Sequence, residues 1–320
     1  MNLKKILIII ISILVLVLAF LLYNIWQSMK SDKPITESPI KKIPITSSVI
    51  NTTQLQKIQQ LTTRPIIGLT IADQKLKYFD KLNGHIFEMA LDGTREREII
   101  SSDIAGLKSV IWEEAGAKAI IQTQEKQYFY DFETNQVVLV DFEEPIFCKN
   151  KIFYLCSFGV CQISGEGEKQ EIAFQTAMRD LKLVCANQNI YIYQKPSIKA
   201  PGIVYQIDPF KKIIGPYYGL IFKSPDNYSI GLEPHNTIAD KCAGDYCAVP
   251  QNLDKNILMP DDYYKNLIIT QDAFWDIKNK KEIIKTSFDA QNLLVFENKL
   301  YFTDKATGYL YMIRLDSGLQ

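Results

Sequence analysis

One local pattern recurs along most of this chain: a short aromatic strand, a polar turn that begins with Asp, and a second strand. Asp starts such turns because its side chain bonds to its own backbone, and Gly or Asn accepts the positive φ that the turn needs. The aromatic side chains fill the space between twisted sheets that stack face to face. Copies of the pattern lie at residues 78–87, 128–137, 205–213, 274–282 and 300–311.

The runs around these turns are short and rich in β-branched and aromatic residues, which is typical of an all-β fold. Repeated four-stranded units of about 40 residues around an axis describe a β-propeller. We therefore expect residues 65–316 to form a β-propeller of about six blades, with five or seven also possible, and 317–320 to be a tail. A pair of β-sandwiches is the alternative, disfavoured because the hairpin recurs along the whole domain. The expected strands include Ile66–Ile71, Leu76–Phe79, Gln127–Phe132, Gln136–Val140 and Leu267–Ile269.

The N-terminus carries an apolar run that predicts a membrane anchor in residues 1–26. Lys4 and Lys5 precede the run from Ile6 to Tyr23, and Trp26 follows it. About 20 apolar residues span a bilayer core, and Tyr and Trp favour its interfaces. A cleaved signal peptide is the alternative, but its apolar region would be shorter and would end in small residues. The positive-inside rule places the N-terminus in the cytoplasm, so the propeller would be extracytoplasmic at the plasma membrane.

Residues 27–64 read as a flexible basic linker, rich in Ser, Thr, Pro, Lys and Gln. Within it, Leu55, Ile58 and Leu61 have helical spacing, so this part could be a short docked helix or a loop. The formal net charge of the chain is zero, which gives no reason to expect nucleic-acid binding. The zero is an average, because the linker is basic while residues 66–320 hold 28 Lys and Arg against 34 Asp and Glu. The 47% of hydrophobic residues excludes a disordered chain.

Six cysteines support the exported location. Two pairs flank short turns with the same spacing, Cys156 with Cys161 and Cys242 with Cys247, and we expect both pairs to form disulfides. Free buried thiols are the alternative.

The other two cysteines, Cys148 and Cys185, lie within apolar strands and are expected to be free, buried thiols. A zinc site is disfavoured by the cysteine spacing and by the presence of only His85 and His235.

The hairpins resemble those of WD40-like propellers of the TolB type. Further segments resemble an uncharacterised group of bacterial propellers that are carried on one N-terminal membrane anchor; they are residues 61–68, 247–250, 260–264 and 274–275. The resemblance covers residues 61–316 and implies the propeller architecture, but it implies little about activity. The usual Trp-Ser-Pro-Asp-Gly turn is reduced to Trp112-Glu113-Glu114-Ala115-Gly116, and residues 144–173 lack the Asp turn.

The longest irregular segment, residues 229–266, is where we expect a partner to bind. It holds His235, and the pairs Asp261-Asp262 and Tyr263-Tyr264 lie near its end, followed by Trp275. Long loops in compact domains are often functional, and Tyr is enriched in interfaces. The alternative is that these tyrosines cover one end of the propeller core. The 254–264 loop also carries side-chain oxygen atoms of the kind that Ca²⁺ prefers, so the binding of a Ca²⁺ ion there is an open alternative.

The sequence contains no nucleophile elbow, P-loop or dinucleotide fingerprint. We therefore expect a non-catalytic protein-interaction or scaffold module without a cofactor or a resident metal. The alternatives are a glycan-binding propeller that uses Trp275, or a propeller hydrolase or lyase with its site at the central channel.

Overall fold

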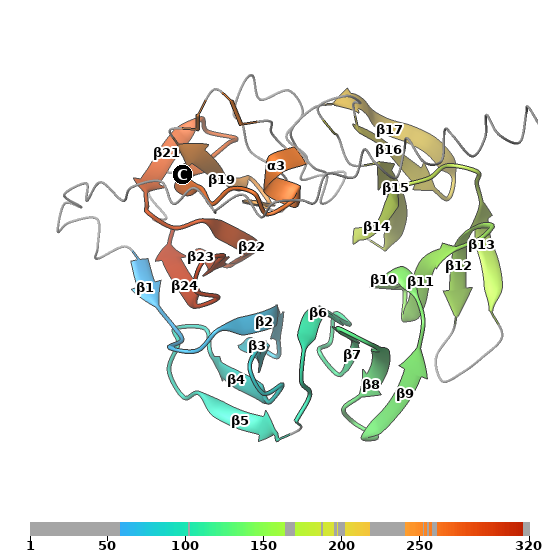
Figure 1. Ribbon diagram of the computed structural model, residues 1–320, viewed down its shortest axis with the longest axis horizontal. Coiled ribbons are helices and arrows are strands. Elements are labelled where there is room, and N and C mark those ends of the chain that lie inside the picture. Colours follow the sequence, from blue (N-terminus) through green and yellow to red (C-terminus); the bar gives the residue numbers. More distant parts are fainter. Residues whose placement is uncertain are drawn as a thin grey trace, which may run out of the picture. The chain divides into compact units, whose positions relative to one another are not determined.

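The structure, a computed structural model, describes residues 58–101, 103–163, 170–186, 188–194, 197, 202–217, 241–251, 253–254, 256–257 and 261–315. These residues belong to one compact unit, Ser48–Gln320. They form six four-stranded antiparallel sheets, which confirms the prediction of a propeller with six blades. Figure 1 shows the sheets around a ring, with β2, β6 and β10 toward the centre and β5, β9 and β13 at the periphery.

Each of the first three blades is built from four consecutive strands. Blade 1 contains β2 (Ile66–Ala72), β3 (Lys75–Asp80), β4 (Ile86–Ala90) and β5 (Arg97–Ile100). Blade 2 contains β6 (Leu107–Trp112), β7 (Lys118–Thr123), β8 (Gln127–Asp131) and β9 (Gln136–Val140). Blade 3 contains β10 (Glu143–Cys148), β11 (Lys151–Cys156), β12 (Gly159–Ile163) and β13 (Glu171–Gln175).

Blades 4 and 5 follow the same order, and blade 6 takes strands from both ends of the domain. Blade 4 contains β14 (Leu181–Ala186), β15 (Asn189–Gln194), β16 (Gly202–Ile207) and β17 (Phe210–Tyr217). Blade 5 contains β18 (Cys242–Ala243), β19 (Tyr246–Gln251), β20 (Gln271–Asp276) and β21 (Lys281–Lys285), with the short helix α3 (Asp261–Tyr264) between β19 and β20. Blade 6 contains β22 (Ala290–Phe296), β23 (Lys299–Asp304), β24 (Leu310–Arg314) and β1 (Ile58–Gln60).

The strand β1 closes the ring. It pairs antiparallel with β24, with Ile58 opposite Ile313 and Gln60 opposite Tyr311. Of the apolar residues noted in the expected linker, Ile58 packs against the cluster of blades 5 and 6, Leu61 packs against the cluster of blades 1 and 6, and Leu55 lies outside the described residues. The segment is a strand, where the sequence left a helix or a loop open, and the propeller therefore begins before residue 65.

The Asp turns have the geometry that the repeated pattern predicts. Asp80 accepts the backbone N–H of Leu82 at 2.8 Å, and Asp131 accepts that of Glu133 at 2.9 Å. The turns occupy different places, however, because Asp80 ends the second strand of its blade and Asp131 ends the third. The same Asp turn thus connects the second and third strands in one blade and the third and fourth strands in another. The repeat therefore has an irregular spacing in the sequence.

Hydrophobic clusters hold neighbouring blades together. Phe79 and Ile86 of blade 1 pack with Ile121 of blade 2, and all three are fully buried. Each such side chain contributes about 1.5–3 kcal/mol relative to exposure in water. In the described part of the chain, clusters of this kind join blades 1–2, 2–3, 3–4, 5–6 and 6–1. The core therefore consists of layers between blades and not of one central mass.

All six cysteines form disulfides. Cys156–Cys161 and Cys242–Cys247 are confirmed as local bridges. The prediction of free thiols at Cys148 and Cys185 is wrong, because these residues form a third bridge. They lie on β10 and β14, the first strands of blades 3 and 4, with their Cα atoms 5.5 Å apart. Three disulfides indicate an extracellular or otherwise oxidising compartment.

The N-terminal anchor predicted for residues 1–26, with Lys4, Lys5, Ile6, Tyr23 and Trp26, lies outside the described residues. Among the residues that are described, no helix has the length and apolar character needed to cross a bilayer.

One expected strand is absent from the structure. Residues Leu267–Ile269 follow α3 without joining a sheet, and Leu267 and Ile269 are both exposed. Their apolar character and the β-branched Ile268 and Ile269 suit a strand, but they lie in the connection between β19 and β20, which pair directly with each other.

Candidate functional site

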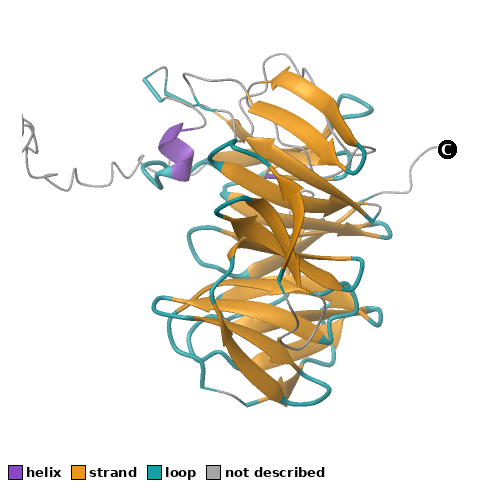
Figure 2. Ribbon diagram, turned by 90° about the vertical axis from the view of Figure 1, so that its right-hand side faces the viewer, coloured by secondary structure: helices purple, strands orange, loops and turns teal. Residues whose placement is uncertain are grey.

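The expected contact residues around α3 divide into buried and accessible ones. The helix stands on one face of the ring, beyond the ends of the strands (Figure 2). Tyr263 is only 5% exposed, and its hydroxyl donates to Asp289 at 3.3 Å. This geometry fits the alternative considered above, in which tyrosine covers the end of the core. Asp261, Asp262 and Tyr264 are partly exposed.

Beneath α3 lies a fully buried lysine. The ammonium of Lys241 donates to Asp272 and to Asp289 at 2.6 Å each, and to Thr270 and the carbonyl of Ala290 at 2.9 and 3.1 Å. Burial raises the pKa of Asp272, an effect that the adjacent Lys241 opposes. The cluster joins blade 5, through Lys241 and Asp272, to blade 6, through Asp289 and Ala290.

A second lysine completes this region. Lys305 Nζ lies 3.9 Å from the centroid of the Tyr263 ring, and burial lowers the pKa of Lys305. Tyr263 is therefore held between a carboxylate at its hydroxyl and an ammonium at its face. Every partner in this cluster faces inward, so its geometry supports a structural junction.

The remaining predicted residues lie apart from this cluster. Trp275 is half-buried and packs against the Cys242–Cys247 bridge, so only part of its ring is available to a ligand. His235 lies outside the described residues. Among those that are described, no three His, Cys, Asp or Glu side chains are grouped so that they could hold a metal ion.

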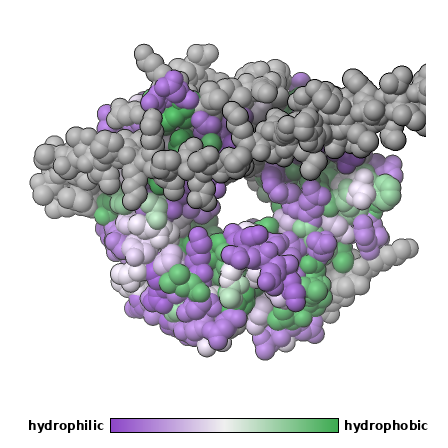
Figure 3. All heavy atoms as spheres, viewed as in Figure 1, coloured by the Kyte–Doolittle hydropathy of each residue, from purple (hydrophilic) through white to green (hydrophobic). Residues whose placement is uncertain are grey.

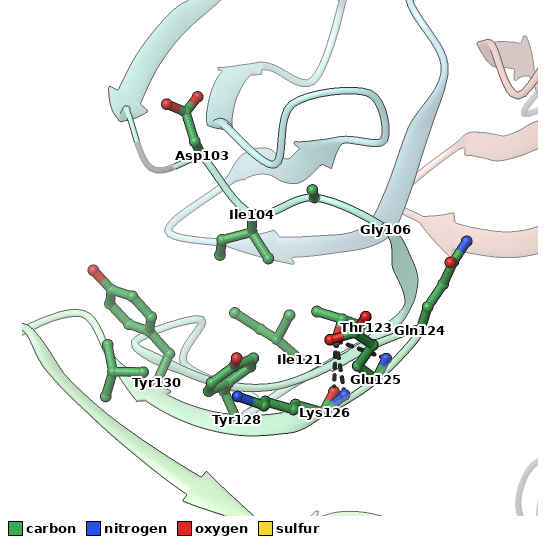
Figure 4. Close-up of a pocket in the computed structure, with 12 residues that line it drawn as sticks. Asp103, Ile104, Gly106, Ile121, Thr123, Gln124, Glu125, Lys126, Tyr128 and Tyr130 are labelled. Carbon is green, nitrogen blue, oxygen red and sulfur yellow. Dashed lines mark hydrogen bonds between the residues drawn. The ribbon is translucent and has the colours of Figure 1, made fainter.

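The structure adds a site that the sequence did not indicate, a pocket of about 690 Å³ between blade 2 and the connection from β5 to β6. Ile104, from the connection between β5 and β6, faces Ile121, Tyr128 and Tyr130 of blade 2 across it (Figure 4). The turn at its end is held by Thr123, whose hydroxyl donates to the carbonyl of Lys126 at 2.9 Å. Polar lining comes from Asp103, Gln124, Glu125 and Lys126.

The apolar side of this pocket continues onto the outer strand β9. Val137 lies opposite Tyr130 and Leu139 lies opposite Tyr128 in the β8–β9 ladder, so the four side chains share one face of blade 2. Val137 also lines the pocket. Its side chain is 53% exposed, and those of Val138 and Leu139 are 45% and 63% exposed. We call the pocket together with β9 the blade 2 groove. Hydrophilic and hydrophobic side chains are mixed in small groups over the visible face of blades 1 and 2 (Figure 3).

A histidine that contacts two carboxylates borders the groove. His85 Nε2 lies 3.2 Å from Asp103, and Nδ1 lies 3.3 Å from Glu98. The hydrogen bond to Asp103, followed by that to Glu98, raises the pKa of His85 despite partial desolvation. These contacts tie the connection that carries Ile104 to blade 1.

The comparisons with known proteins give distant structural similarities. No family model matches the sequence, and no curated protein matches it. Similar solved structures include the propeller domain of Cps50 (Swd1) from Myceliophteria thermophila, with 9% identity, a TM-score of 0.49, and 80% of this chain and 99% of that chain covered. The gluconolactonase XC5397 from Xanthomonas campestris has 12% identity and a TM-score of 0.47 over 81% of this chain and 89% of that one. An oligogalacturonate lyase in complex with manganese has 13% identity and a TM-score of 0.40 over 81% and 80%.

Proposed function

We propose that this chain is a membrane-tethered, extracytoplasmic β-propeller that binds a protein partner through the blade 2 groove and acts as a non-catalytic scaffold. The observation that carries the proposal is the exposure of Val137 and Leu139 on the same face of blade 2 as a pocket lined by Tyr128 and Tyr130. Contiguous exposed apolar surface rimmed by polar residues is typical of interaction sites. Tyrosine is enriched at such sites because it offers both an apolar ring and a hydroxyl.

The location rests on two further features. The three disulfides support an oxidising compartment, and the apolar run from Ile6 to Tyr23 supports a membrane anchor. Protease added to intact cells should then remove the propeller while leaving the anchor in the membrane fraction. Full protection of the propeller would contradict the proposed orientation.

The binding role is tested by a photo-crosslinking amino acid placed in the full chain at Leu139, in living cells. The matched control is the same amino acid at Ile172, which is 49% exposed on the outer strand of blade 3. We expect an adduct of one discrete mass from position 139 and none from 172. If both positions give the same diffuse products, or neither gives any, the proposal fails.

A glycan is the second candidate ligand, because Tyr128 lines the pocket beside Gln124 and Glu125. Aromatic rings that stack on sugars and polar side chains that bond to hydroxyls would suit such a ligand. A glycan array probed with the full chain, with Tyr128→Ala as the comparison, separates this candidate from a protein partner.

A further inference from the structure

The strand β9 has one unpaired edge. It pairs with β8 over its whole length, and no strand among the described residues pairs with its other edge. A free edge presents a row of backbone N–H and C=O groups that can bind another strand. In Figure 1, β9 lies at the periphery of the ring, where neighbouring blades diverge.

Charged side chains protect the other outer strands of similar length. Charge on an edge strand opposes pairing with another chain. The strand β9, with sequence Gln-Val-Val-Leu-Val, carries none. Among the outer strands that the structure describes, the other one without charge is β1, which has three residues. The charged residues on the remaining described outer strands are Arg97, Glu98, Glu171, Lys211, Lys212, Lys281, Glu282 and Lys285.

The groove indicates which side chains an added strand would carry. Val137 and Leu139 face the pocket side, so alternate residues of an added strand would lie beside them and the pocket would accept one apolar side chain. The surroundings are acidic. Glu133 precedes β9, Asp141 follows it, and Asp103 and Glu125 line the pocket. Basic side chains nearby include Lys126 in the lining, Lys108, which donates to the carbonyl of Gln124 at 3.5 Å, and His85, which pairs with Asp103. A complementary segment would therefore carry basic residues at its ends.

We propose that an extended segment of a partner protein, with apolar residues at alternate positions and Lys or Arg at its ends, adds to β9 as a fifth strand of blade 2. Backbone hydrogen bonds to β9 supply affinity, and the pocket and acidic rim supply selectivity. This inference rests on the proposed binding role of the blade 2 groove and names how the partner is held.

The test uses the full chain in detergent and a labelled peptide, Lys-Val-Thr-Val-Thr-Val-Lys, with binding followed by fluorescence anisotropy. The control peptide has the same side chains but methylated interior amides, which removes its hydrogen-bond donors. A second control replaces both lysines by Glu. We expect the first peptide to bind, the methylated peptide to bind at least about tenfold more weakly, and the Glu peptide to bind more weakly at low ionic strength.

Two protein variants localise the binding. Val138→Lys places a charge on β9, and Ile172→Lys places one on the exposed outer strand of blade 3. Both sites are partly exposed, so both variants should keep the melting temperature of the parent chain. Val138→Lys should weaken peptide binding about tenfold or more, and Ile172→Lys should not change it.

Other outcomes overturn the inference in distinguishable ways. Equal binding of the methylated peptide would show recognition by side chains alone. A dimer of the parent chain that Val138→Lys converts to a monomer in sedimentation would assign β9 to a second copy. If no peptide binds while Leu139 still crosslinks to one discrete partner, strand addition fails and the proposed binding role stands. If both experiments fail, the proposed function fails with the inference.

Discussion

The ammonium of Lys241 lies 2.6 Å from the carboxylate of Asp289, and this ion pair crosses the junction between blades 5 and 6 with neither side chain exposed. Asp272 completes the arrangement from the blade 5 side at the same distance. Each buried charge in this cluster is stabilised by the opposite charges around it. Removing one of them therefore leaves the others buried without compensation.

Replacing Lys241 by Met should therefore destabilise the protein strongly. Two buried carboxylates would lose their common cation, and breaking a buried ion pair from one side costs about 3–5 kcal/mol. Urea unfolding under non-reducing conditions measures the change in the free energy of unfolding. Lys281→Ala, at an exposed position on β21, is the control and should change stability by less than about 0.5 kcal/mol. Equal midpoints for the two variants would contradict the structural role of Lys241.

The three disulfides should differ in how much they stabilise the chain. Cys148–Cys185 closes a loop with a sequence separation of 37, and Cys156–Cys161 closes one with a separation of 5. In the chain-entropy account, their removal costs about 4 and about 2 kcal/mol respectively. Paired Ser substitutions, compared by urea unfolding, test this order. A larger loss for the short loop would show that the bridge between blades 3 and 4 adds little constraint.

The turn carboxylate Asp131 should make stability depend on pH. Burial alone would raise its pKa, but the N–H groups of Thr134 and Glu133 and the ammonium of Lys118 outweigh burial and lower it. A lowered pKa contributes stability above the unfolded value of about 3.9, and that contribution is lost as the pH falls below it. Asp131→Asn should therefore destabilise the protein at pH 7, and the difference from the parent should shrink below about pH 4.

The control for this titration is Asp141→Asn, at an exposed position just after β9. Its difference from the parent should stay small over the same range. A gap between parent and Asp131→Asn that is constant from pH 7 to pH 3 would exclude a contribution from the charge of Asp131.

His85 should titrate above the ordinary histidine pKa of about 6.5, because Asp103 and Glu98 both favour its charged form. Ring-proton chemical shifts in NMR measure this directly. Asp103→Asn should lower the pKa of His85 more than Glu98→Gln does, since the hydrogen bond to Asp103 is the larger cause. A midpoint that neither substitution moves would show that the two contacts are absent in solution.

Local patterns in the sequence predicted those parts of the fold that depend on local contacts. The Asp turns follow from neighbours within three residues, such as Asp131 with Glu133 and Thr134. Cys242 and Cys247 pair because they lie opposite each other in one hairpin. The blade number follows from dividing the domain by the length of the repeat.

Contacts between blades were harder to predict, because they depend on register between distant strands. Cys148 and Cys185 are separated by about one blade length, so both lie near the ends of successive first strands. That spacing is a signal that could have identified the bridge. Lys241 carried no such signal, since lysine is almost always exposed. The uncharged edge of β9 could be recognised only by comparing the outer strands of the blades. The sequence does not show which strands are the outer ones until the topology is known.

The closure of blade 6 has a mechanical consequence. The chain enters the ring through β1, and β1 is held by its ladder to β24, near the other end of the domain. Any tension applied to the residues before Ile58 is therefore borne first by this short three-residue ladder. The pairing of β1 with β24 closes the ring when the domain folds, and it is also where the ring would first open under force.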